Sequence, residues 1–132
     1  MGKYVFGKTV AKGFDQTVDA VTQALAKEGF GVLTDIDVAA TLKKKLGIER
    51  PAYRILGACN PQFAAQAIAF EPQIGALLPC NVVVRADAAD AEGRTVVEFM
   101  DPDAVLKLVD RPEVAGIAAE VRARLERVMA AL

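Results

Sequence analysis

The side chains best able to do chemistry in this sequence gather in one segment, from Cys59 to Cys80. Cys59 directly precedes Asn60-Pro61. This pair is typical of a helix start, because Asn caps unpaired backbone N–H groups and Pro already holds a helical φ. The N–H groups and the dipole at a helix start favour negative charge. We therefore predict that Cys59 is the more reactive of the two thiols.

Other residues of this segment have more than one interpretation. Glu71 stands among apolar residues, where burial would suit it to general acid or base chemistry, but it can equally be an exposed helix end. Cys80 lies between Pro79 and a run of valines, and both cysteines can simply be small buried core residues. A redox pair would need their Cα atoms within about 7 Å.

Two arginines on predicted strands, Arg54 and Arg85, either project into solvent or anchor an anion through bidentate contacts. A small anionic ligand is therefore possible. The candidate ligand-binding residues are Cys59, Asn60, Glu71, Cys80, Arg54 and Arg85. No catalytic residue, metal ligand or cofactor is assigned.

The composition excludes several kinds of chemistry. The chain has no histidine, which removes Ser-His-Asp and Cys-His mechanisms and imidazole metal ligands. Its two cysteines cannot complete a four-ligand zinc site. The glycine-rich phosphate-binding motifs are missing. Whether the protein is an enzyme stays open.

The charge balance points away from polyanionic partners. Lys and Arg number 16 and Asp and Glu 17, so we expect neither nucleic-acid nor membrane binding. Lys43-Lys44-Lys45 is most simply a solvated helix face. The first residues lack the apolar core of a signal peptide, and two cysteines suit a reducing compartment, so we expect a cytoplasmic protein.

The elements that must position these residues alternate along a single domain, residues 1–132. Strands are predicted over 4–10, 30–37, 51–59, 81–86 and 94–100, and helices over 15–27, 38–46, 61–71, 102–109 and from 112 to the end. Helical connections come first and a hairpin across the polar 87–93 loop comes last. We therefore predict a two-layer α+β fold, with helices packed on a mixed sheet of about five strands.

Two strands allow finer predictions. The consecutive valines Val82, Val83 and Val84 indicate a central strand that is covered on both faces and pairs antiparallel with residues 94–100. In the second strand, simple alternation would point Val32, Thr34 and Ile36 the same way.

The central segment, residues 56–84, also resembles a known family. It reads Leu-Gly-Ala-Cys-Asn-Pro, then an alanine-rich helix, then Glu-Pro-Gln-Ile-Gly-Ala-Leu-Leu-Pro-Cys-Asn-Val-Val-Val. This resembles the family catalogued as domain of unknown function 302, and Gly29-Phe30 and Asp101-Pro102 fit the same pattern. The resemblance implies a small α+β domain, often a dimer, and carries no agreed activity.

Two functional hypotheses follow. The first is a small-molecule or ion-binding domain with a pocket near Cys59 and the 71–80 connector. The second is a non-catalytic, dimeric protein-interaction module. A pocket lined by Cys59, Glu71 and Arg85 would favour the first hypothesis, and a flat apolar patch would favour the second. We also expect a homodimer, since the connector around Ile74 to Leu78 is unusually apolar for a loop.

Overall fold

Five strands form one sheet in this computed structural model, which describes residues 2–87 and 93–132. The strands are β1 (Val5–Val10), β2 (Gly31–Asp37), β3 (Tyr53–Cys59), β4 (Cys80–Ala86) and β5 (Thr95–Met100). Their order across the sheet is β1-β5-β4-β3-β2. The valine strand β4 is therefore central and pairs antiparallel with β5, as the sequence predicts. The predicted 87–93 loop lies mostly outside the described residues.

Every neighbouring pair of strands is antiparallel, whereas the sequence predicts a mixed sheet. Helical connections usually join parallel neighbours. Here β3 lies directly beside β2, and β4 lies directly beside β3, although a helix connects the two strands of each pair. The connection from β1 leads instead to the opposite edge of the sheet. The α+β class is confirmed, and only the mixed pairing is wrong.

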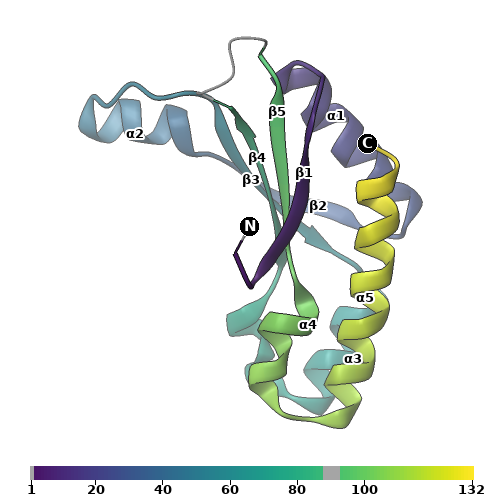
Figure 1. Ribbon diagram of the computed structural model, residues 1–132. Coiled ribbons are helices and arrows are strands. Elements are labelled where there is room, and N and C mark those ends of the chain that lie inside the picture. The colour runs from purple at the N-terminus through teal and green to yellow at the C-terminus, as the bar shows by residue number, and fades with distance from the viewer. Residues whose placement is uncertain (1, 88–92) are drawn as a thin grey trace.

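The helices lie on different sides of the sheet (Figure 1). They are α1 (Phe14–Lys27), α2 (Val38–Leu46), α3 (Pro61–Phe70), α4 (Pro102–Val105) and α5 (Pro112–Ala130), with short 3-10 helices η1 (Pro72–Leu77) and η2 (Leu106–Val109). In Figure 1, α1 and α5 cover one face, and α3 and α4 lie at one end of the sheet. Helix α2 projects toward the other side.

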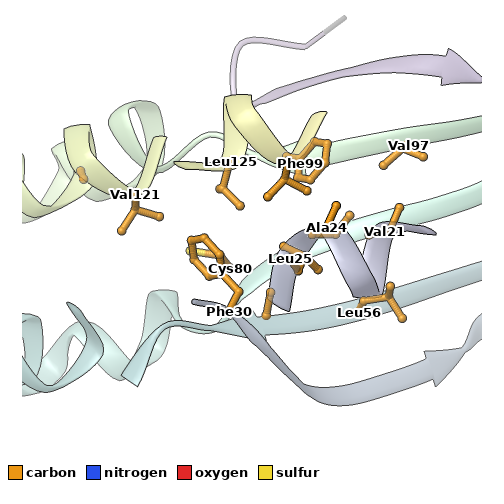
Figure 2. Close-up of a cluster of buried hydrophobic side chains, with 14 of the residues drawn as sticks. Val21, Ala24, Leu25, Phe30, Leu56, Cys80, Val97, Phe99, Val121 and Leu125 are labelled. Atoms are coloured by element: carbon orange, nitrogen blue, oxygen red, sulfur yellow. The ribbon is translucent and has the colours of Figure 1, made fainter. Parts of the chain in front are cut away.

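The core fills the space between the sheet and the two long helices (Figure 2). Its fully buried side chains include Val21, Leu25, Leu56, Val82, Val84, Val97, Phe99, Val114, Leu125 and Val128. The valine run of β4 obeys simple alternation. Val82 and Val84 are inaccessible to solvent, and Val83, on the other face, remains partly exposed. Within one chain the central strand is therefore fully covered on one face only, which corrects the prediction that both faces are covered.

A bulge interrupts the pairing of β2 with β3. Val32 pairs with Ala58 and Thr34 pairs with Gly57, so the pairing register shifts between them. Paired residues share a face of the sheet and adjacent residues do not. Val32 and Thr34 consequently point to opposite faces, and their predicted common face is wrong.

Candidate functional site

The two cysteines lie at the same end of neighbouring strands. Cys59 is the last residue of β3 and Cys80 is the first of β4. The antiparallel register places Ala58 opposite Cys80, one position from Cys59. Both thiols are free. The fold thus brings together two residues that are 21 positions apart in the sequence.

The environments of the two thiols differ. Cys80 is buried against the core, and Cys59 is partly accessible. Burial, and secondarily the charge of Cys59, raises the pKa of Cys80 to about 11. The thiol of Cys80 is therefore neutral at physiological pH and behaves as an apolar group.

Asn60 has a structural role beside these thiols. Its side chain caps α3 by accepting a long hydrogen bond from the Phe63 N–H at 3.5 Å, as the Asn-Pro pair predicts. Its amide group also packs against the turn at Gly29, which has a φ of +87°. A Cβ at Gly29 would approach Asn60 Nδ2 to 3.0 Å, so this turn needs glycine for both its φ and its contact with Asn60.

The same turn is tied to α5. Arg124 Nη1 donates to the Glu28 carbonyl at 3.0 Å, and Arg127 Nε donates to the Glu28 carboxylate at 2.8 Å. The Arg124 guanidinium also lies 5.0 Å from the centre of the Phe63 ring. These contacts join the end of α1, the start of α3 and the last helix around one region.

An apolar cavity of about 340 Å³ lies in this region. The ends of β3 and β4, helices α3 and α5, the start of β2 and the 71–80 connector all contribute to its wall. Among the described residues, seventeen line the cavity and none of them carries a charge. Of these seventeen, only Asn60 and Thr34 have side chains with polar oxygen or nitrogen atoms. In Figure 2, Phe30 and Cys80 lie side by side below Val121, and all three belong to the cavity wall.

Small side chains leave room for the cavity. Ala64 and Ala67 of α3 and Ala58 of β3 line it, where larger residues would fill the space. The sequence shows that this helix is rich in alanine, yet it does not show that Ala64 and Ala67 border a hollow. Phe30 and Phe63 were missed as site residues, because their contacts depend on how separate elements meet.

Three of the six candidate residues line the cavity and three do not. Cys59, Asn60 and Cys80 line it together with the connector residues Gly75, Leu78 and Pro79. Glu71 borders a separate hollow with Leu77 and Leu108, and its Oε2 lies 3.7 Å from Arg111 Nε. Within the part of the chain that the structure describes, the cavity wall thus includes both cysteines and part of the 71–80 connector, but neither Glu71 nor any charged side chain.

Arg54 and Arg85 lie at the opposite end of the β3–β4 pair, where Tyr53 pairs with Arg85. Each arginine already binds a carboxylate. Arg85 Nε donates to Glu98 Oε1 at 2.8 Å, and Arg54 makes two hydrogen bonds to Asp35. The hydrogen bonds from Arg54 lower the pKa of Asp35. Arg54 and Arg85 therefore lie at the other end of the strand pair from Cys59 and Cys80.

Two further features concern metals and membranes. Within residues 2–87 and 93–132, no group of three or more Cys, Asp or Glu side chains is placed to hold a metal ion. Among those same residues, no helix combines the length and apolar character needed to cross a membrane.

These features define a small antiparallel α+β domain with an apolar cavity at one end of its sheet. The model of the family described as Domain of unknown function DUF302 matches residues 6–132, and the chain belongs to that family. A similar solved structure is the crystal structure of an uncharacterized conserved DUF302 protein from Bacillus stearothermophilus, whose sequence is 28% identical to this chain. The comparison covers 98% of both chains with a TM-score of 0.88. A comparison with curated proteins gave no match.

Proposed function

We propose that the protein binds a small uncharged molecule, or the apolar part of a larger one, in the cavity beside Cys59. The observation that carries this proposal is the cavity wall, which offers about 340 Å³ of space and no charged side chain. Ligand sites are typically concave and mostly apolar, with few polar groups. An ion alone would lose its hydration there without compensation.

The size of the cavity narrows the ligand class. An apolar protein cavity of about 150 Å³ stays dry and accepts benzene. This cavity is more than twice that volume, which suits a fused bicyclic ring or a short hydrocarbon chain. Leu33 and Ile68, whose side chains are 68% and 47% exposed, extend the apolar wall to the protein surface and provide an entry route.

The test uses the neutral fluorescent probe N-phenyl-1-naphthylamine with the intact chain. We expect saturable fluorescence enhancement and slower alkylation of Cys59 by iodoacetamide while the probe is bound. Replacing Ala64, which lines the cavity, by Phe fills the space and should weaken probe binding at least tenfold.

The matched control is Ala65→Phe on the same helix. Ala65 is exposed and lies outside the cavity, so this variant should bind the probe as the parent protein does. Absence of saturable binding, or equal affinity in Ala64→Phe and the parent, would show that the cavity is not a binding site.

We also propose that the chain forms a homodimer, although through a different surface from the one expected from the sequence. Ile74, within the apolar connector, is 1% exposed and already belongs to the core of its own chain. Support comes instead from three exposed apolar side chains: Ile36 on β2, Leu46 at the end of α2 and Ile48 just after α2. The two free thiols support a reducing, cytoplasmic location.

A further inference from the structure

Helix α2 has no buried residue, although both of its ends are well capped. Asp37 accepts a hydrogen bond from the Ala40 N–H at 2.9 Å, and Gly47 closes the other end in a left-handed conformation. A nine-residue helix is marginal in water without tertiary packing. Among the strands and helices of the described residues, α2 makes its main contacts with β3. Val38, Ala39 and Leu42 are only half-buried, so this short helix is incompletely packed within its own chain.

Apolar side chains continue beyond this helix. Leu46 is 66% exposed and Ile48, just past the Gly47 turn, is 46% exposed. We call residues 38–48 the α2 arm. In Figure 1 the arm extends from the sheet on the side away from α1 and α5.

The sheet face on that side carries an aliphatic row. The strand registers place Ile36 beside Ile55, and Ile55 beside Val83. Ile36 is 49% exposed, and the other two remain accessible in part. Ile36 lies two residues before α2 begins, so the row and the arm form one continuous surface.

We propose that a second copy of this chain covers the open sheet face, with the α2 arm of each copy packed against the other. This inference rests on the homodimer proposed above and assigns its interface. The arrangement is isologous, since one two-fold axis applies the same surface to both copies. In this arrangement the partner copy covers the second face of β4, where Val83 lies. The valine run predicts that both faces are covered, and a single chain covers only one fully.

The available area matches what a stable dimer needs. The whole face of five strands, spaced about 4.8 Å apart with about six residues each, measures roughly 480 Å². This area includes Glu98, which follows Val83 in the row and keeps its ion pair with Arg85 within the interface. The arm helix adds roughly 140 Å² in projection. The sum of about 620 Å² per copy falls within the roughly 600 to 1,000 Å² per partner of a typical specific interface.

The competing arrangement pairs β2 with its own copy edge to edge. β2 carries Asp35 and Asp37 as well as the bulge at Val32. Charged residues and bulges are common devices against edge pairing. Face-to-face packing of the two sheets is therefore favoured over edge-to-edge pairing of β2.

The test is sedimentation equilibrium from about 1 to 100 μM protein, on the intact chain and two single variants, Leu46→Asp and Ile48→Asp. Both residues are exposed in a single chain, so the variants should fold normally. Each substitution occurs twice in an isologous interface, and we expect at least a hundredfold rise in the dimer dissociation constant.

The matched control is Leu108→Asp, because Leu108 is 78% exposed but lies on η2, outside the proposed interface. This variant should remain dimeric. A monomeric parent protein over the whole range would refute both the homodimer and this interface. A dimer that persists in both arm variants would refute the interface alone and leave the homodimer standing. Probe binding in the cavity, unchanged in all variants, would separate either result from the ligand proposal.

Discussion

The two ends of the β3–β4 pair belong to one sheet but differ in chemical character. At one end, Cys59 and Cys80 border a cavity without a charged group. At the other, Arg54 and Arg85 each bind a carboxylate at the surface. The apolar end leaves space unfilled, whereas the charged end leaves neither arginine without a partner. The candidate site is therefore defined by space that side chains leave unfilled rather than by reactive charge.

The largest effect should follow from placing a charge at the apolar end. Ala67 is 3% exposed and lines the cavity, so Ala67→Asp should lower the free energy of unfolding by at least about 3 kcal/mol, because a buried carboxylate would lack a partner. Urea unfolding at pH 7 measures this.

The control for that experiment is Ala65→Asp, at an exposed position of the same helix. It should cost less than about 1 kcal/mol, chiefly through lower helix propensity. Similar losses in the two variants would mean that the cavity accepts charge, and the contrast between the two ends would fail.

An intermediate effect concerns Cys80 at high pH. Its pKa is about 11 in the folded protein, against an ordinary value of 9.0. Between these values the unfolded chain releases the thiol proton and the folded chain retains it. The free energy of unfolding should therefore fall from about pH 9 to about pH 11, by up to about 3 kcal/mol.

Unfolding of the parent and of Cys80→Ala under reducing conditions isolates this contribution from other groups that titrate at high pH. The advantage of the parent over the variant should shrink across the pH window. An advantage that stays constant from pH 8 to pH 11 would show that Cys80 does not occupy a desolvating environment.

The smallest effect is expected at the charged end. Arg54 and Asp35 are both partly exposed, so Arg54→Gln should cost no more than about 1 kcal/mol, and less in 1 M salt. The pairing lowers the pKa of Asp35 below its ordinary 3.8. The stabilisation is therefore present at neutral pH and is lost as the pH falls through the folded-state pKa. A loss of several kcal/mol, insensitive to salt, would contradict a surface role for this pair.

Local signals made most elements predictable from the sequence. Gly29 follows α1. Asn60 and Asp101 each cap a helix whose first residue is the following proline, and each side chain accepts a capping hydrogen bond. The valines of β4 identified the central strand. Such features depend on neighbours within a few residues, so a single sequence contains the information.

Features that depend on distant segments were not accessible in this way. The bulge at Val32 reverses the facing of the residues after it, and no local residue type announces it. Asp35, the partner of Arg54, comes from β2, whose neighbours the sequence left open. Glu98, the partner of Arg85, comes from the strand that was predicted to pair with β4, but the register of that pair was left open. Likewise, the sequence proposed Cys59 and Cys80 as candidate site residues, but the apolar cavity beside them required Phe30 and α5 to meet them.

The cavity wall is assembled from segments that span most of the chain, from Phe30 near the N-terminal quarter to Val121 on the last helix. During synthesis, the wall is therefore incomplete until α5 has left the ribosome and docked through Arg124 and Arg127 on the turn at Glu28. On the proposed function, ligand binding requires α5 to be in place. A bound molecule would consequently stabilise only the finished chain, and would report on its integrity as much as on its own abundance.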